Sequence, residues 1–341
     1  MSKKQLGQFY TTNYEYILKN MQIPDNITTI IEPFVGCGDL LSFIKNKQQY
    51  HIEIYDIDPK YENTIKQDTL KNPPQYKDKF VLTNPPYLAR NKSKNKEIYD
   101  KYDCNDLYKC FISILIENVC EGGIIIIPLN FISSIRKSDI TLREKFLKIY
   151  SIHTINIFEE SVFEDTSYSV CSLYFTKKTS TVDDDIDVFI YPSNTTMKIA
   201  LNCENNFTIG GEIYNLPQNP DYKIQRATSK TKDNITNILL KCIDDSANSK
   251  LGFKIVKDHE RFIDDTPKLS ARSYATLVIN KPLTLEQQKN LVKKMNDFLD
   301  EQRNKYNSLF LTNYRESNSI ARKRISFDLA FNICNYSLSL G

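Results

Sequence analysis

The 341-residue sequence has no long apolar run. Its longest aliphatic stretch, Ile124–Ile127, lies between a Gly-Gly pair and a proline, and it is far shorter than the ~20 residues that a membrane span needs. The opening residues, MSKKQLGQFYTT, are polar and aromatic, unlike a secretory signal or a transit peptide. We therefore expect a protein that works in the cytoplasm without a membrane.

Metal-binding and disulfide patterns are also missing. The eight cysteines are scattered and form no Cys-x-x-Cys pair, so we predict reduced, mostly buried thiols. Only His51, His153 and His259 offer imidazoles, and none has a second ligand at a metal-binding spacing. We predict no bound metal.

Length and charge suggest two unlike halves. A chain of 341 residues exceeds what one core usually holds, which favours two domains. Residues 186–341 carry 22 Lys+Arg and 17 Asp+Glu, a net +5, and residues 1–185 carry 23 and 25, a net −2. The basic half favours an anionic partner, although a lysine-rich solvated surface explains the charge equally well.

Residues 27–178 alternate short apolar strands with amphipathic helices, a pattern typical of a mostly parallel sheet covered by helices. A helix capped by Asp106 and ended by Gly122-Gly123 lies between two of these strands. Residues 168–175 alternate like a strand soon after the preceding one, which predicts an antiparallel hairpin that closes the sheet. The expected parallel strands are Thr28–Glu32, Ile52–Asp56, Phe80–Thr83, Ile124–Pro128 and Thr154–Phe158.

The alternation of short strands and helices ends after residue 178. We predict a first domain at 1–178, a linker at 179–185 and a second domain at 186–341. The second domain should contain a helix from Leu285 to about Arg303, opened by a capping box of Thr284 and Gln287. The end of the chain fits a strand or a helix capped by Ser326, and we favour the helix.

A glycine turn follows the first expected strand in Glu32-Pro-Phe-Val-Gly-Cys-Gly-Asp-Leu40. Asp56 stands twenty residues beyond Gly36 at the end of the next strand, where a carboxylate accepts hydrogen bonds from ribose hydroxyls. Leu41 replaces the third glycine of a dinucleotide site, and no Gly-Lys-Ser/Thr follows. The pattern indicates a nucleoside cofactor, and an ordinary strand-to-helix turn is the alternative.

The most specific motif is Asn84-Pro-Pro-Tyr87, directly after an apolar strand. Each proline restricts the residue before it to extended geometry, which fixes the side chain of Asn84 and the carbonyl of Pro85 beyond the sheet edge. Two such acceptors on the hydrogens of an aromatic amine favour a pyramidal nitrogen whose lone pair faces an electrophile. Tyr87 supplies a ring on which a base can stack.

These motifs resemble the N6-adenine DNA methyltransferases of the gamma class, as found in type II restriction-modification systems. The resemblance implies a Rossmann-like α/β class I methyltransferase sheet, S-adenosylmethionine as cofactor and a C-terminal target-recognition domain. Asn84, Pro85, Pro86 and Tyr87 match the catalytic motif, and Phe163, or else the nearby Phe158, would stack the flipped adenine opposite Tyr87. The cofactor residues that it implies are Thr11 (within Gly7–Thr12), Glu32, Phe34, Gly36, Asp56, Ile57, Asp68 and Phe111.

The same chemistry also serves RNA adenine and protein-glutamine methyltransferases, and a catalytically silent nucleic-acid-binding relative is a third alternative. The opening Gly-Gln-Phe-Tyr-Thr-Thr motif and the basic second domain favour double-stranded DNA. We expect a monomer that modifies the site of a cognate restriction endonuclease. The segment Ala89–Lys101 either closes over the DNA backbone or is a solvated loop. The basic residues expected on DNA are Lys230, Lys232, Arg272, Arg315, Arg322, Lys323 and Arg324, with Tyr314 and Asn318 as polar readers.

Overall fold

The computed structural model describes residues 11–163, 169–179, 185–244, 250–265, 273–314 and 322–340. The chain divides into two compact units, the first comprising residues 1–202 with 317–319 and the second comprising residues 203–316 with 320–341. No helix in the described ranges is long and apolar enough to cross a membrane.

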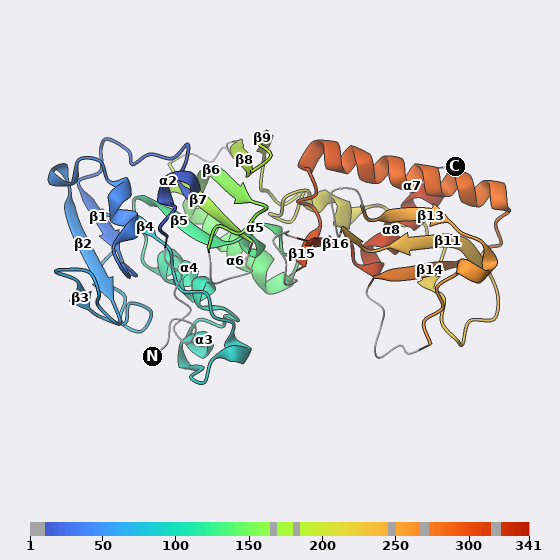
Figure 1. Cartoon of the computed structure of the whole chain (residues 1–341), viewed down its shortest axis with the longest axis horizontal. Coiled ribbons are helices and arrows are strands. Elements are labelled where there is room, and N and C mark those ends of the chain that lie inside the picture. The colour runs from blue at the N-terminus through green and yellow to red at the C-terminus, as the bar shows by residue number, and fades with distance from the viewer. Residues whose placement is uncertain are drawn as a thin grey trace. The chain divides into compact units, whose positions relative to one another are not determined.

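The first unit holds the nine-stranded sheet and the helices around it (Figure 1). Its strands are β1 (Thr29–Glu32), β2 (His51–Asp56), β3 (Ile65–Lys66), β4 (Phe80–Thr83), β5 (Gly122–Pro128), β6 (Tyr150–Phe158), β7 (Val170–Lys177), β8 (Ile186–Tyr191) and β9 (Thr195–Ile199). Its helices are α2 (Tyr14–Ile17), α3 (Glu97–Lys101), α4 (Leu107–Glu117), α5 (Asn130–Ser133) and α6 (Lys137–Ile149), with short 3₁₀ turns η1 (Asp39–Phe43), η2 (Lys47–Gln49) and η3 (Arg90–Lys92).

The strand order in the sheet is β3-β2-β1-β4-β5-β7-β6-β8-β9. Strands β3, β2, β1, β4 and β5 pair in parallel, and β7 runs antiparallel between β5 and β6. The expected α/β class, the mainly parallel sheet and the antiparallel pairing of β6 and β7 are therefore confirmed. The hairpin does not close the sheet as expected, because β8 and β9 continue it beyond β6. All residues of β4 and β5 are buried, which explains their continuous apolar sequence.

Close packing of the neighbouring strands explains the glycine at position 123, the second residue of β5. A Cβ on Gly123 would lie 2.6 Å from the Val81 carbonyl oxygen and 3.0 Å from the Phe175 ring. The Gly122-Gly123 pair thus admits the neighbouring strands, but it does not end α4 as expected, because α4 stops at Glu117 with Asn118 as its C-cap. Asp106 lies at the N-cap of α4, as predicted, but its carboxylate accepts from the Leu88 amide (3.1 Å) instead of capping the helix.

The boundary between the units differs from the predicted one. Strand β8 pairs in parallel with β6, and β9 pairs with β8, so residues 186–199 extend the first sheet. Charge and composition change near residue 186, but backbone pairing continues to residue 199. Residues 180–184 of the expected linker lie outside the described residues.

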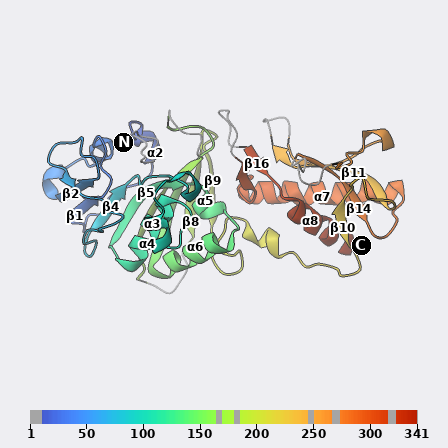
Figure 2. The ribbon, with the colours of Figure 1, turned by 90° about the horizontal axis from the view of Figure 1, so that it is seen from below.

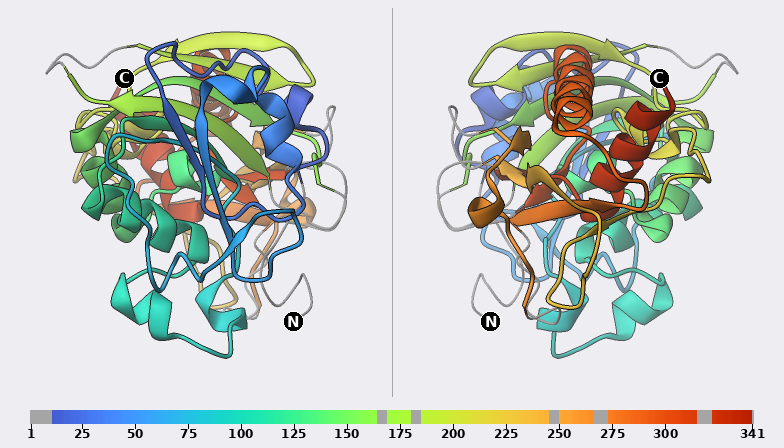
Figure 3. Two further views of the ribbon diagram at one scale, coloured as in Figure 1. Left: turned by 90° about the vertical axis from the view of Figure 1, so that its left-hand side faces the viewer. Right: turned by 90° about the vertical axis from the view of Figure 1, so that its right-hand side faces the viewer.

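The second unit packs helices α7 and α8 against a four-stranded antiparallel sheet in the order β10-β14-β11-β13 (Figure 3, right). Its elements are η4 (Gly211–Asn215), β10 (Ile224–Arg226), β11 (Ile235–Lys241), β12 (Ile243–Asp244), β13 (Gly252–Ile255), η5 (Asp258–Glu260), β14 (Tyr274–Ile279), α7 (Leu285–Tyr306), β15 (Thr312–Tyr314), β16 (Arg322–Arg324) and α8 (Phe327–Ser339). Strands β12, β16 and β15 form a separate small sheet.

Both helices of this unit follow the sequence prediction. The capping box of Thr284 and Gln287 is present at α7, and the Ser326 hydroxyl accepts from the Leu329 amide (3.1 Å) at α8. The terminal segment is therefore a helix. The core that both helices share with the four-stranded sheet includes Ile238, Leu240, Leu277, Leu291, Met295, Leu299, Leu329 and Ile333.

Candidate active site

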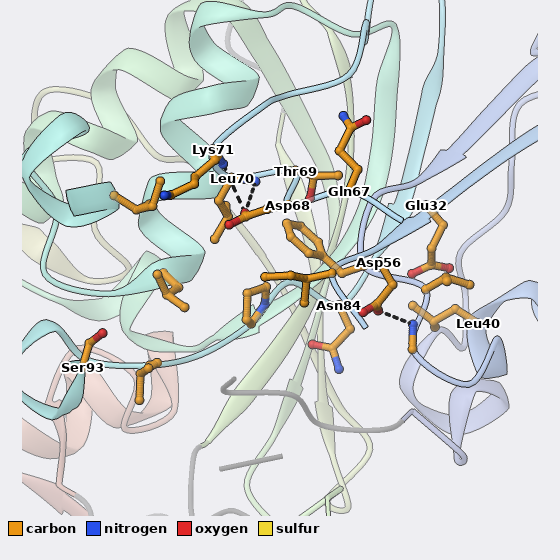
Figure 4. A pocket seen from close by; sticks show the side chains of 18 of the residues that line it. Glu32, Leu40, Asp56, Gln67, Asp68, Thr69, Leu70, Lys71, Asn84 and Ser93 are labelled. Atoms are coloured by element: carbon orange, nitrogen blue, oxygen red, sulfur yellow. Dashed lines mark hydrogen bonds between the residues drawn. The ribbon is translucent and has the colours of Figure 1, made fainter. Parts of the chain in front are cut away.

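The polar residues of the candidate site lie where β1, β2 and β4 end. These strands are parallel neighbours in the sheet, so their carboxyl ends meet at one edge, where open α/β sheets usually bind ligands. They bring Glu32, Asp56 and Asn84 to one cavity of about 310 Å³, which Thr11 and Asp68 also line. Figure 4 shows Glu32 and Asp68 toward opposite ends of this cavity, with Asp56 and Asn84 between them.

The glycine turn between β1 and η1 binds Asp56. Gly36 and Gly38 have φ values of 55° and 84°, a region in which a side chain is strained. The Gly36 amide donates to one Asp56 oxygen (2.9 Å), and the Asp58 amide donates to the other (2.8 Å). The turn leads into a five-residue 3₁₀ helix where an ordinary helix was expected. The carboxylate of Asp56 is thus held in a fixed orientation at the cavity.

Glu32 is a buried acid without a hydrogen-bond partner for Oε2 among the described residues; its exposed fraction is 1%. Burial raises the pKa of Glu32 well above 4.5. The Thr83 side chain lowers this pKa, and the nearby carboxylates of Asp56 and Asp39 raise it. An unpaired buried carboxyl is costly. A cationic ligand group entering the cavity would relieve that cost.

Asp68 and Phe34 line the cavity as expected, but Phe111 does not. The Asp68 carboxylate accepts from the amides of Leu70 and Lys71 (both 3.2 Å). Phe111 is fully buried and packs edge-on against Phe34, with ring centroids 5.1 Å apart. The expectation that Phe111 lines the cofactor site is corrected to a supporting contact behind Phe34.

Ile57 follows Asp56 at the end of β2 and also lines the cavity, with 38% of its surface exposed. An exposed aliphatic side chain beside the ribose acid suits packing against an adenine ring.

The Asn84 amide is held at both ends. Its Nδ2 donates to Oγ1 of buried Thr11 (3.0 Å), and its Oδ1 accepts from the Tyr87 hydroxyl. The same hydroxyl donates to the Ile126 carbonyl (2.6 Å), so two acceptors share its single hydrogen. The amide is thereby pointed along the cavity edge beside Pro86, which also lines the cavity.

The aromatic rings expected to stack the target base are buried. Tyr87 is 2% exposed and packs edge-on against Tyr108 at 6.3 Å, and burial raises its pKa well above the usual value. Phe163 is 5% exposed, and Phe158 is fully buried and stacked on Tyr191 at 5.7 Å. The structure thus assigns Tyr87 a contact with Asn84, while its stacking role and that of Phe163 require a rearrangement.

The segment after the catalytic motif forms a wall of the cavity. It folds into η3 and α3, and its Ser93, Asn95 and Tyr99 line the cavity. An ion pair between Lys71 and Glu97 (2.8 Å) joins it to the opposite rim. Most residues of Ala89–Lys101 are exposed, although the segment folds into short helical turns, and its closing over the DNA backbone stays a prediction. The segment is short and polar, so it has no periodic pattern that would predict these helical turns.

The residues expected to contact DNA differ in their exposure to solvent. Lys230 and Lys232 are exposed and Arg324 is partly exposed, whereas Lys323 is 5% exposed, so its burial does not support a surface contact. Arg272, Arg315 and Asn318 lie outside the described residues, and the side chains of Tyr314 and Arg322 are not described. In the described part of the chain, no cluster of three or more His, Cys, Asp or Glu side chains is arranged for a metal ion.

Comparison with known proteins finds similar solved structures and one family of similar sequences. A modification subunit of a putative type I restriction enzyme from Vibrio vulnificus YJ016 aligns with 15% identity and a TM-score of 0.41 over 54% of this chain and 47% of that one. A type I restriction-modification methyltransferase subunit from Streptococcus thermophilus aligns with 18% identity and a TM-score of 0.39 over 54% of this chain and 47% of that one. The DrdV–DNA complex aligns with 15% identity and a TM-score of 0.44 over 70% of this chain and 35% of that one.

The chain therefore spans less than half of each of these solved chains. A search of curated proteins returned no match. The profile of the family described as N-6 DNA Methylase matches residues 48–212, which contain Asp56, Asp68 and the whole Asn84–Tyr87 motif. Residues 48–212 of this chain are thus similar to the N-6 DNA methylase family.

Proposed function

We propose that the protein transfers a methyl group from S-adenosylmethionine to the N6 amine of adenine in double-stranded DNA. The observation that supports this most directly is the convergence of Glu32, Asp56 and Asn84 on one cavity. Asp56 and Asn84 also lie within the segment matched by the N-6 DNA methylase family. The volume of about 310 Å³ lies at the lower end of the ~300–1,000 Å³ usual for small-molecule sites.

The residues present fit the cofactor. The unpaired Oε2 of Glu32 suits the methionine ammonium, Asp56 suits the ribose hydroxyls, and Asp68 suits the adenine amine. When bound, S-adenosylmethionine supplies a methyl group made electrophilic by its sulfonium. The cofactor would thus lie along the cavity from Glu32 to Asp68.

Asn84 performs the positioning step at the target amine. Its Oδ1 and the Pro85 carbonyl accept the two amine hydrogens and direct the nitrogen lone pair toward the methyl group. Thr11 and Tyr87 hold the Asn84 amide in place. The amine nitrogen would take the methyl group as the methyl–sulfur bond breaks and its electron pair returns to sulfur, which leaves a neutral thioether, and one amine proton would leave along these acceptors to solvent.

The target base must leave the duplex to reach Asn84. A stacked adenine cannot place its amine at a cavity beyond a sheet edge, so we propose base flipping, with Tyr87 and Phe163 rearranging to hold the base. We further propose a monomeric modification enzyme of a restriction-modification system, paired with a cognate endonuclease.

Replacement of Asn84 by alanine tests the function. We expect Asn84→Ala to lower the single-turnover rate of methyl transfer by about 10²-fold or more with little change in cofactor affinity. Exposed Asn72→Ala is the control and should keep the wild-type rate. Labelled methyl groups are traced to N6-methyladenine by nucleoside analysis. Label on RNA, on protein glutamine or on cytosine would contradict the proposal and favour a methyltransferase that acts on that substrate. No label anywhere would favour a catalytically silent relative.

A further inference from the structure

A groove runs along edge strand β10 of the second unit. One cavity of about 660 Å³ lies between β10 and the start of α8 and is lined by Arg226, Lys230, Arg324 and Phe327. A second, of about 460 Å³, shares Lys230 and adds Lys232 and Lys223. Helix α8 contacts β10 directly, as Figure 2 shows. The two cavities share lining residues and are called the β10 groove below.

The β10 groove is positively charged. Its lining cations are Lys223, Arg226, Lys230, Lys232 and Arg324, and its lining anions are Asp233 and Asp328. Five positive and two negative charges leave +3. A polyanion such as the DNA backbone complements this charge and releases counterions when it binds.

Arg226 lies in the groove between an acid and an aromatic ring, and no motif in the sequence indicates this position. Its Nη1 lies 2.7 Å from Oδ2 of Asp264, which is 5% exposed. Its guanidinium lies 5.3 Å from the centre of the Phe327 ring, which stacks on Phe331. The Asp264 amide donates to the Ala227 carbonyl (3.1 Å), which fixes the acid beside β10. Asp264 comes 38 positions after Arg226 in the sequence, so no local motif reveals the pair.

Fixed and exposed cations suit different contacts. An arginine whose planar fork is held by a buried carboxylate and a ring pays little entropy when it binds the edge of a base with two hydrogen bonds. Exposed lysines such as Lys230 and Lys232 suit phosphates, which lie at regular spacing and need no fixed donor direction.

We propose that the β10 groove binds the DNA duplex, with Lys230 and Lys232 on phosphates and Arg226 reading a base edge. This inference rests on the proposed DNA substrate and adds the surface that selects the methylated site. It makes Arg226 a specificity-determining residue and the two lysines affinity residues.

The first test separates base reading from charge. Arg226→Lys keeps the positive charge and removes the planar fork. Genomic DNA from cells expressing each protein is sequenced for modified bases. We expect methylation of sites that differ from the wild-type site at one position to rise about 5- to 150-fold relative to the cognate site. An unchanged site in Arg226→Lys, with wild-type methylation intact, would overturn the role of Arg226.

The second test addresses the phosphates. Binding to a duplex carrying the wild-type site is measured against salt concentration for Lys230→Gln/Lys232→Gln. We expect the slope of log affinity against log salt to fall by about 1.8, because each phosphate contact contributes about 0.9, while the methylated sequence stays the same. The matched control, Lys289→Gln/Lys293→Gln, removes two exposed charges from α7 and should leave the slope unchanged.

Equal slopes in both double variants would overturn the groove as the DNA surface. That outcome is distinguishable from failure of the proposed function, because wild-type methyl transfer to the same duplex is measured alongside. If the wild type transfers methyl groups to DNA but the slopes are equal, only the DNA-binding role of the β10 groove is rejected. If the wild type transfers no methyl groups to DNA, the proposed DNA substrate itself is rejected.

Discussion

The role of Tyr87 can be decided by removing its hydroxyl and keeping its ring. In the structure this hydroxyl donates to Oδ1 of Asn84 and to the buried Ile126 carbonyl. Tyr87→Phe deletes the contact that orients the catalytic amide. We expect the single-turnover methyl-transfer rate to fall about 2- to 13-fold, since a neutral hydrogen bond contributes ~0.5–1.5 kcal/mol. Cofactor affinity should not change.

The same substitution should lower stability. The Ile126 carbonyl lies in fully buried β5 and loses its side-chain donor, which costs ~1–3 kcal/mol. Urea unfolding of both proteins measures this loss. Tyr108→Phe is a matched control, because Tyr108 is an equally buried neighbour at 6.3 Å whose hydroxyl has no hydrogen-bond partner among the described residues. It should cost neither rate nor stability.

Two results would refute this reasoning. If Tyr87→Phe transfers methyl groups at the wild-type rate while Tyr87→Ala is inactive, the ring acts by stacking the flipped base and the hydroxyl does not position Asn84. If Tyr108→Phe slows transfer as much as Tyr87→Phe, the loss reflects general disturbance of the core. Rates are compared at saturating DNA and cofactor so that only the chemical step is measured.

Three further predictions concern the cofactor cavity. Asp56→Ala should weaken S-adenosylmethionine binding by ~1.5–3 kcal/mol in calorimetry, and superimposable titrations would place the cofactor elsewhere. Lys71→Glu alone should speed cofactor dissociation in stopped-flow measurements by about 1.5- to 5-fold, because the pair with Glu97 is exposed; Lys71→Glu/Glu97→Lys should restore the rate if the ion pair closes the cavity wall. The raised pKa of Glu32 predicts a contribution to folding stability that is present below about pH 4.5 and is lost as pH rises through the folded-state pKa. Glu32→Gln should flatten this part of the stability profile in urea unfolding, and an unchanged profile would show that the acid is already paired.

Local sequence predicted much of the sheet because a buried parallel strand is a continuous apolar run that ends in polar residues. Glu32, Asp56 and Asn84 each end such a run, and adjacent parallel strands necessarily bring those ends together. The capping box at Thr284 is equally local. These features depend on a few consecutive residues, so one sequence suffices to find them.

Other features depend on contacts between distant residues. Strand β8 belongs to the first sheet because it pairs with β6, although composition changes near residue 186. The buried position of Tyr87 depends on the Ile126 carbonyl across the sheet. The fixed position of Arg226 depends on Asp264 from another segment. Spacing along the chain carries no signal of such pairs, which is why the analysis of motifs missed them.

The unpaired Oε2 of buried Glu32 is the feature that links stability to function most directly. A side chain that only had to fill the end of β1 would be apolar, because burying an acid without a partner opposes folding. Here the acid is retained at the edge of a cavity whose other end carries Asp68. The neighbouring acids Asp56 and Asp39 raise its pKa further, so removing the proton is unfavourable until a positive charge arrives. A ligand with a cationic group at one end and a hydrogen-bond donor at the other satisfies both ends of the cavity at once. Such a ligand should therefore stabilise the first unit more strongly as pH rises, and a smaller analogue that lacks the ammonium should lose this pH dependence.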